Sequence, residues 1–238
     1  MHDRTGPAGG NNLRRVFGER ILVIANSRKL GGRCVAGVSL RTGRLVRPVS
    51  PYGDGALSDR QCEIGGRTPQ LLDIVSFAHR GAGRDPAQPE NLVIADAPWK
   101  LAGRASRRQA LTMLLRAACA GPKLFDNRGR AVAETVAAKG LDASLALIEP
   151  TRLRFGHGSA ADAHAGSPRA LFEFGGQEWS LPVTDFELGP RILRLPEGLH
   201  QWADLGLDEP RRTLLTVSLG MAHEGWHHKL VAAVLRFR

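Results

Sequence analysis

The chain has 238 residues, of which 42% are hydrophobic and 24% charged, proportions typical of a folded domain and unlike those of a disordered chain. Lysine and arginine outnumber aspartate and glutamate by 33 to 23, which gives a formal net charge of +10. No apolar run approaches the roughly twenty residues of a membrane helix, and the first residues lack an apolar stretch of secretory length, so we expect a cytoplasmic protein without membrane contact.

The first part of the chain shows short strands separated by frequent turns. The expected strands cover residues 19–26, 34–40, 45–49, 71–78 and 91–95. They are rich in β-branched residues and are bounded by glycine, proline and polar clusters. This pattern is typical of a sandwich or a small barrel.

The middle of the chain predicts one helix, over 106–119, in which apolar residues recur at helical spacing. Ser106 is a suitable N-cap, and Gly121-Pro122 ends the helix. The segment 134–139 is compatible with either a short helix or a strand.

Strand signals return after the helix. The expected strands cover 143–148, 152–155, 169–174, 178–183, 191–195, 213–219 and 229–237, with a helical turn near 199–205. The segment 157–167 reads as a hairpin loop. We therefore expect two β-rich halves flanking a helical middle.

Arginine dominates the positive charge, with 28 arginines against five lysines. A basic folded surface is typical of nucleic-acid binding, because the planar guanidinium forms two hydrogen bonds with phosphate and stacks on bases. A coding bias towards arginine in an otherwise basic enzyme is the alternative.

No motif predicts catalysis, a cofactor or a metal. The cysteines Cys34, Cys62 and Cys119 form no Cys-x-x-Cys pair, so we expect free thiols. Walker, Rossmann and nucleophile-elbow patterns are absent from the sequence. His223 and His227 match His-Glu-x-x-His, but that motif needs a helix, and Gly225 lies within it between two strand-like segments. We expect a turn there, and a metal-dependent hydrolase is the weakest of our hypotheses.

The segment between the first two strands carries the most informative polar residues. Asn26, Ser27, Arg28 and Lys29 follow a buried strand, and Arg33 precedes the next one. Such a loop can meet a phosphate or a base edge. A solvated basic loop in which Asn26 only caps a turn is the alternative.

Arg47 and Ser50 follow at the end of a neighbouring predicted strand. We expect Arg47 to point at the same patch, so that Arg33→Ala and Arg47→Ala would weaken binding without lowering the melting temperature.

Several segments resemble the bacterial dual OB-containing domain family. The strongest likeness lies in ILVIANSRKLGGRCVAGVSLRTGRLVRPVS, and weaker ones lie in Val183-Thr184-Asp185 and in LLTVSLG with HHKLVAAVL near the end. The resemblance implies two OB-like barrels, which agrees with the mainly β pattern. Because the first residues are rich in glycine, asparagine and small polar residues, we divide the chain into a flexible segment 1–18, a first domain 19–140 that includes the helix, and a second domain 141–238. The resemblance also implies a shared site that includes Asn26, Ser27, Arg33, Arg47, Ser50, Thr184 and Asp185.

The same resemblance implies a non-enzymatic binding module of bacterial defence systems, with nucleic acid or nucleotides as ligands and an effector protein as a partner. Our first hypothesis is a basic groove for single-stranded nucleic acid. The alternative is a nucleotide or modified-base sensor with a pocket between the Asn26 loop and the Asp185 segment. The 13 aromatic residues are few for base-stacking platforms, which keeps the smaller ligand open.

Overall fold

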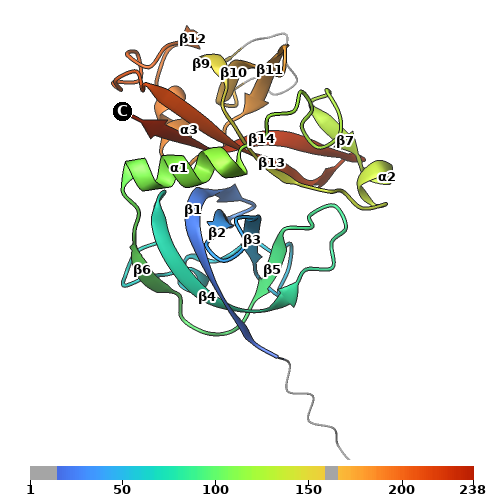
Figure 1. Ribbon diagram of the computed structural model, residues 1–238. Coiled ribbons are helices and arrows are strands. Elements are labelled where there is room, and N and C mark those ends of the chain that lie inside the picture. The colour runs from blue at the N-terminus through green and yellow to red at the C-terminus, as the bar shows by residue number, and fades with distance from the viewer. Residues whose placement is uncertain (1–14, 159–165) are drawn as a thin grey trace, which may run out of the picture.

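The computed structural model describes residues 15–158 and 166–238, and its first half is a closed barrel (Figure 1). The barrel strands are β1 (Phe17–Lys29), β2 (Gly32–Ser39), β3 (Leu45–Val49), β4 (Asp73–Ala82) and β5 (Asn91–Ile94). They follow the order β1-β2-β3-β5-β4, and β4 pairs back onto β1. β3 and β5 are parallel, whereas the other pairs are antiparallel. A short helix, η1 (Asp59–Gln61), follows β3, and β6 (Lys100–Arg104) pairs with β4.

The apolar run of β1 is buried on both faces of the strand. Ile21 and Val23 point into the barrel, where they pack with Phe77 and other barrel residues. Leu22 and Ile24 point outward and join a second cluster that reaches into the other half of the chain. Strands with two buried faces read as continuous apolar runs rather than as alternating ones.

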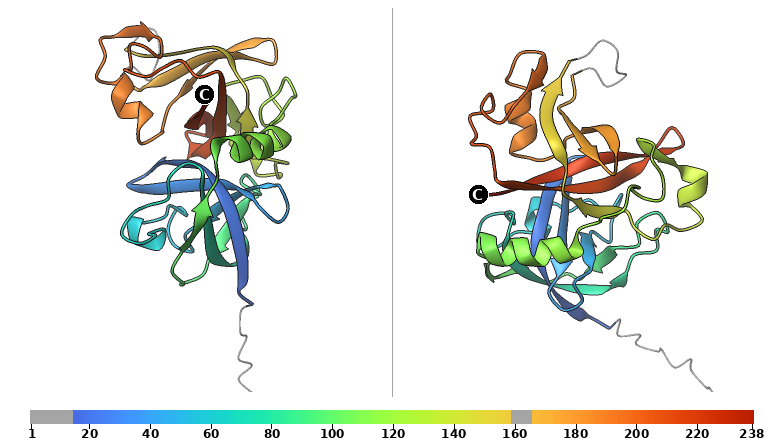
Figure 2. Two further views of the ribbon diagram at one scale, coloured as in Figure 1. Left: turned by 60° about the vertical axis from the view of Figure 1, so that its left-hand side comes forward. Right: turned by 45° about the horizontal axis from the view of Figure 1, so that its top comes forward.

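The predicted central helix is α1 (Arg107–Ala117). Ser106 caps this helix, because its hydroxyl oxygen accepts the Gln109 backbone N–H. The Gln109 side-chain oxygen accepts the Ser106 backbone N–H, which completes a capping box. Ala110 and Leu114 are its buried residues. They belong to the same cluster as the outward face of β1, so α1 covers one side of the junction between the halves (Figures 1 and 2).

The second half is built from two four-stranded sheets that form a half-barrel. One sheet has the order β7 (Ala131–Ala133), β14 (Trp226–Phe237), β13 (Arg212–His223), β8 (Leu145–Ile148). The other has the order β11 (Gln177–Pro182), β10 (Arg169–Phe174), β9 (Thr151–His157), β12 (Gly198–His200). Two short helices, α2 (Glu134–Ala137) and α3 (Leu188–Ile192), complete this half. Its core lies between the sheets and includes Phe155, Trp179 and Trp202.

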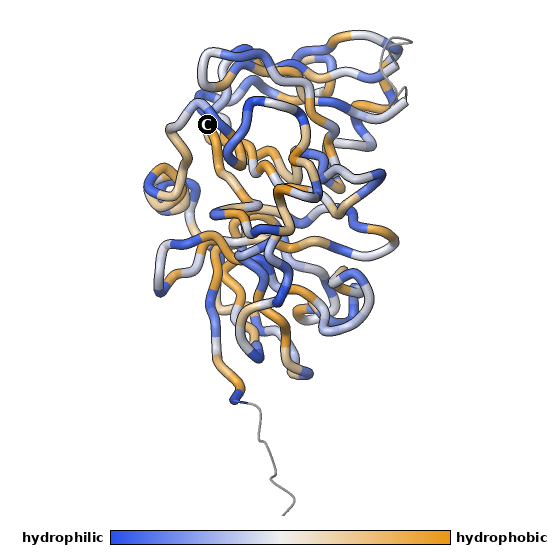
Figure 3. The backbone as a smooth tube through the Cα atoms, turned by 90° about the vertical axis from the view of Figure 1, so that its right-hand side faces the viewer, coloured by the Kyte–Doolittle hydropathy of each residue, from blue (hydrophilic) through white to orange (hydrophobic). Residues whose placement is uncertain are grey.

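The two halves share a hydrophobic interface. The outward side chains of β1 and β2 pack against β8, β13 and β14, with Ala36, Leu147 and Leu235 among them. Figure 3 shows hydrophobic segments gathered where the halves meet. Burial of apolar surface therefore stabilises the pair as one unit.

The prediction of a mainly β fold with two OB-like units is confirmed. The predicted strand over 191–195 is wrong: α3 begins at Leu188, and it buries Leu188 and Ile192 one turn apart. The division at residue 140 also differs from the strand pairing, because β7 pairs with β14 and so belongs to the second half.

Two further predictions involve residues without a described structure. Residues 1–14 of the expected flexible segment and 159–165 of the expected hairpin loop lie outside the described residues, whereas Phe17 and Gly18 already belong to β1. Within the described ranges, no helix has the length and apolarity needed to cross a membrane.

Candidate nucleic-acid interface

The outer face of β1, β2 and β3 is not open to a ligand. In OB-folds the strand 2–3 face and adjoining loops commonly bind oligonucleotides. Here the apolar outer side chains of β1 and β2 are buried against β13 and β14. A ligand of the first barrel must therefore bind away from this face.

Arg47 lies on this covered face and is not a surface contact. Its side chain is only 2% exposed. One guanidinium nitrogen donates to Asn91 Oδ1 (3.1 Å) and Ser144 Oγ (3.0 Å), and the other donates to the Ser144 carbonyl (3.3 Å) and Ser218 Oγ (3.1 Å). Since Ser144 and Ser218 belong to the second half, Arg47 joins the halves, and the expectation that it points at the basic patch is wrong.

The loop expected at 26–29 is instead the end of β1, where these residues pair with β2. This end of β1 meets the Thr184–Asp185 segment, as the resemblance implied. The Arg28 backbone N–H donates to the Thr184 carbonyl (3.0 Å), and Ser27 forms an isolated bridge with Asp185. Two arginines contact the Phe186 ring: the guanidinium carbons of Arg28 and Arg33 lie 5.1 Å and 4.3 Å from its centre. The alternative hypothesis expected a nucleotide pocket between Asn26 and Asp185. Within the described residues, these two segments instead contact each other directly.

Ser27, Thr184 and Asp185 hold this junction together. Ser27 and Asp185 are both buried. Asp185 Oδ1 accepts the backbone N–H groups of Glu187 and Leu188, each at 2.8 Å, and burial raises the pKa of its carboxyl group. The Thr184 backbone N–H donates to the Val231 carbonyl (2.9 Å). These three residues are therefore positioned to stabilise the contact between β1 and the segment after β11 rather than to meet a ligand.

Arg33 anchors the loop that follows β3. It forms an ion pair with Asp59, the first residue of η1, and donates to Asn26 Oδ1 (3.3 Å). The hydrogen bond from Arg33 holds the pKa of Asp59 below its ordinary value. Asn26 in turn donates to the Pro69 carbonyl (2.7 Å). Through these contacts the β1–β2 hairpin fixes η1 in place.

Lys29 and Ser50 support the same loop from its other end. Lys29 Nζ donates to the Asp54 carbonyl (2.6 Å), and burial lowers the pKa of the amine. Ser50 Oγ accepts the Tyr52 backbone N–H (3.2 Å) and a side-chain N–H of Gln61 (3.1 Å). The predicted residues of the first half therefore shape the segment 50–61.

That segment forms one wall of an open groove of about 500 Å³, which we call the loop groove. The groove is lined by Pro51, Tyr52, Arg60, Gln61, Arg80, Ile94, Ala95, Asp96, Ala97 and Pro98. Tyr52 is 76% exposed. Arg60 and Arg80 are exposed, and no residue in the described ranges forms an ion pair with either. Sequence reasoning missed all three, although Tyr52 is the sole tyrosine of the chain and follows a proline in a polar loop.

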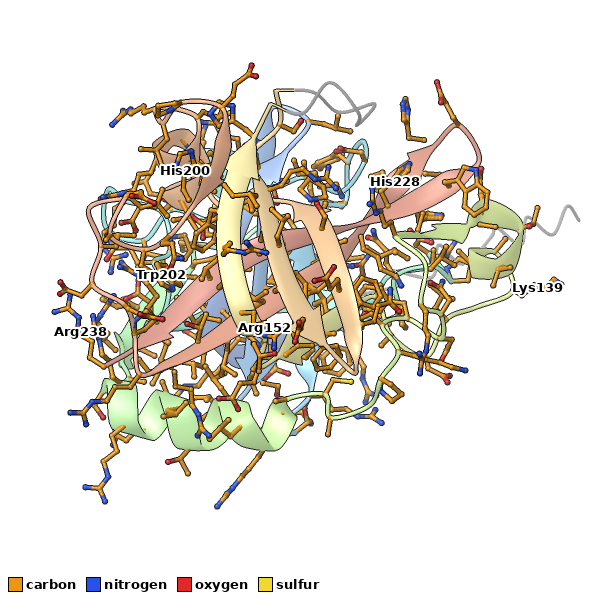
Figure 4. All side chains as sticks on the ribbon, turned by 90° about the horizontal axis from the view of Figure 1, so that it is seen from above. Lys139, Arg152, His200, Trp202, His228 and Arg238 are labelled. Atoms are coloured by element: carbon orange, nitrogen blue, oxygen red, sulfur yellow. The ribbon has the colours of Figure 1, made fainter. Side chains whose placement is uncertain are left out.

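A second groove, of about 550 Å³, lies on the other half, beside β9 (Figure 4). Arg152, Arg154, Arg211 and Arg212 are among its lining residues. Arg212 pairs with Glu149 (2.6 Å) and Arg152 pairs with Glu173 (2.7 Å). Its aromatic residue, Trp202, is only 5% exposed. This groove offers charge without a ring on which a base could stack.

The His-Glu-x-x-His segment lies at the tip of the β13–β14 hairpin, with a turn at Glu224 and Gly225, as predicted. His227 contacts the Gly220 carbonyl through Nδ1 (2.9 Å), and His223 is exposed. Across the described residues, no group of three histidine, cysteine or acidic side chains is arranged to hold a metal ion.

Comparison with known proteins agrees with this architecture. The model of one protein family, described as the dual OB-containing domain, matches residues 19–234. No curated protein and no solved structure matches the chain. Because the family model spans nearly the whole sequence, the chain belongs to the dual OB-containing domain family.

Proposed function

We propose that this OB-fold binding module binds single-stranded nucleic acid in the loop groove. The observation that carries the proposal is the exposed ring of Tyr52 beside two unpaired arginines, Arg60 and Arg80, in one open groove. Proteins that bind single strands combine stacking rings with cationic grooves that follow the phosphates.

In the loop groove, the Tyr52 ring would contact a base of the strand, and the two arginines would contact its phosphate backbone. The Tyr52 ring offers a face to one base, and this stacking requires a base that is not already stacked within a duplex. Arg60 and Arg80 neutralise phosphates and release counterions. Asp96 is the acidic residue of the lining, so the groove keeps a positive balance.

The supporting residues give the groove a fixed shape before the ligand arrives. Arg33 holds η1 through Asp59, and Ser50 binds both Tyr52 and Gln61. A preformed site loses less conformational entropy on binding than a mobile loop does.

Fluorescence anisotropy with a labelled oligothymidine tests the proposal. Tyr52→Ala should weaken binding by about fivefold to a hundredfold, the range for loss of one base–ring stack. Tyr52→Phe should retain binding, because the ring rather than the hydroxyl makes the stack. A duplex of the same length should bind more weakly than the single strand.

Salt dependence tests the two arginines. Each of Arg60→Gln and Arg80→Gln should reduce the slope of log K against log salt by about 0.7. Arg44→Gln is the matched control, because Arg44 is exposed at the opposite end of β3. If the Arg60→Gln/Arg80→Gln double variant keeps wild-type affinity and slope, the loop groove is not the binding site.

The proposal includes a sensor role in a bacterial defence system, which the family resemblance supports. In that role the bound strand would be signalled to a separate effector protein. The test is phage challenge of cells that carry the native locus: Tyr52→Ala should abolish protection, whereas Tyr52→Phe should keep it. Equal protection by both variants would contradict the sensor role.

A further inference from the structure

The groove of about 550 Å³ beside β9 has no part in the proposed function, and we call it the β9 groove. Its lining residues come from within 149–154, 201–202 and 209–213, so β9 and the segment that leads into β13 both line it. Arg152 and Trp202 mark it in Figure 4. All of its lining residues belong to the second half, and none is shared with the loop groove.

Part of β9 has an edge that no strand covers. On one side β9 pairs with β10. On the other side β12 pairs only with residues 155–157 of β9, and a turn at 202–206 follows β12. Within the described residues, no strand therefore pairs with 151–154 along this edge. The unpaired N–H and C=O groups of such an edge are a template for another extended chain.

This open edge lies in the β9 groove. Arg152, Leu153 and Arg154 belong to the uncovered part of β9 and line the groove. Four residues of extended chain span about 13 Å. When a peptide adds a strand to a sheet edge, main-chain hydrogen bonds supply affinity and alternate side chains supply specificity. The β9 groove therefore suits a short extended peptide that continues the sheet beside β12.

The charge of the β9 groove selects an acidic peptide. Four arginines and two glutamates line it, and two of these arginines already have glutamate partners. Arg154, on β9, and Arg211, just before β13, are exposed and form no ion pair with any residue that the structure describes. Glu209 is the lining glutamate without such a pair, so a positive balance remains. Exposed guanidinium groups bind carboxylates through two parallel hydrogen bonds.

The same lining favours a peptide over a nucleic-acid strand. Single strands bind through rings that stack on their bases, and the aromatic residue of this groove, Trp202, is only 5% exposed. A sugar–phosphate backbone also lacks the alternating N–H and C=O groups that match a strand edge. Pro150, Leu153 and Pro210 add apolar surface on which the aliphatic side chains of a peptide can pack.

We propose that the β9 groove binds an extended acidic segment of another protein, which adds a strand to the open edge of β9. The backbone of that segment would pair with residues 151–154. Carboxylates on alternate residues, which share one face of a strand, would contact Arg154 and Arg211. This inference goes beyond nucleic-acid binding in the loop groove, because it involves other residues and another class of partner.

Fluorescence anisotropy of the full chain with a labelled hexapeptide of alternating glutamate and valine tests the site. This peptide should bind, and the same peptide with lysine in place of glutamate should not. Arg154→Gln and Arg211→Gln should each weaken binding by about twofold to fivefold, the effect of losing one exposed ion pair, and the double variant by about fourfold to twenty-five-fold. Arg108→Gln is the matched control, because Arg108 is exposed on α1 and does not line the groove.

Methylation of the peptide amides tests the addition of a strand. In an added strand, alternate N–H groups face β9 and the others face solvent. N-methylation of the valines and N-methylation of the glutamates should therefore differ: one should abolish binding and the other should retain it. Hydrogen exchange of the amides at 151–154 should slow when the unmethylated peptide is bound, which charge attraction alone would not cause.

The inference would be overturned by no binding of the acidic peptide at millimolar concentration, by wild-type affinity in the Arg154→Gln/Arg211→Gln variant, or by equal effects of the two methylations. Displacement of the peptide by oligothymidine from the Tyr52→Ala protein would instead assign the groove to nucleic acid. A dimer in sedimentation that the double variant abolishes would assign it to contacts between copies of this chain. The two proposals fail separately, because Tyr52→Ala should keep peptide binding and the double variant should keep the stack on Tyr52.

Discussion

Replacing Arg47 with alanine should destabilise the protein strongly. The guanidinium donates four hydrogen bonds, three of them to the second half, and is almost fully buried. Hydrogen bonds from a charged donor contribute roughly 1.5–3 kcal/mol each. Four such contributions do not add, because removing the charge also removes the cost of burying it.

The net loss in unfolding free energy should be about 3–5 kcal/mol, because truncation leaves the buried acceptors of Asn91, Ser144 and Ser218 without their donor, at roughly 1–3 kcal/mol for each unsatisfied group. For a chain of this size, each kcal/mol lowers the melting temperature by about 2–4 °C, so a decrease of roughly 6–20 °C follows. Arg47→Lys should fall between the wild type and Arg47→Ala, because lysine keeps the charge but lacks the planar fork.

Urea denaturation monitored by circular dichroism measures this loss, with Arg44→Ala as the exposed control, which should change stability by no more than about 0.5 kcal/mol. The unfolding transition should stay single, since Arg47 and the shared core bind the halves together. A loss below about 1 kcal/mol for Arg47→Ala would show that Arg47 is not a structural bridge between the halves.

Two further predictions concern buried ionisable groups. Lys229 is 1% exposed, and burial lowers the pKa of its amine from 10.5 to about 8. Between these two pH values the unfolded chain binds more protons than the folded one, so the free energy of unfolding should rise with pH. Lys229→Met should flatten this rise in urea denaturation measured at several pH values. Identical pH slopes for the two proteins would contradict this. Asp73 is fully buried. Burial opposes its ionisation, but hydrogen bonds from Arg67, the Gln70 N–H and Arg104 lower the pKa of its carboxyl group. Its contribution to the free energy of unfolding should therefore be present above the ordinary pKa of aspartate and be lost as acid protonates the folded carboxylate. Asp73→Asn should therefore lower stability at neutral pH while making acid unfolding shallower, and a variant with the wild-type acid profile would argue against this role.

The fold was predictable where local sequence and tertiary packing agree. The β-branched runs of β1, β2, β13 and β14 become strands because both their local preference and their burial favour extended chain. α1 starts at its predicted cap because Ser106 and Gln109 complete a purely local set of hydrogen bonds. The sequence does not predict β6, because Lys100–Arg104 is short and largely exposed, contains a glycine and becomes a strand by pairing with β4.

The candidate site was only partly predictable. The family likeness at 26–29 and at Thr184–Asp185 indicated two segments that do meet, although the first is the end of β1 and not a loop. The burial of Arg47 could not be foreseen, because its partners Ser144 and Ser218 lie 97 and 171 residues further along the chain. The position of Tyr52 depends on a local bond to Ser50 and also on the contact between Ser50 and Gln61, eleven residues further along, which the local sequence does not specify.

The burial of the outer face of β1 and β2 has a practical consequence for dissecting this protein. A fragment ending before β8 would present Leu22, Ile24 and Ala36 to water, and the complementary fragment would leave Leu214 and Leu235 uncovered. Large exposed apolar surfaces of this kind promote aggregation. Experiments on either half should accordingly use substitutions in the intact polypeptide, since truncation would expose the apolar face that the two halves share.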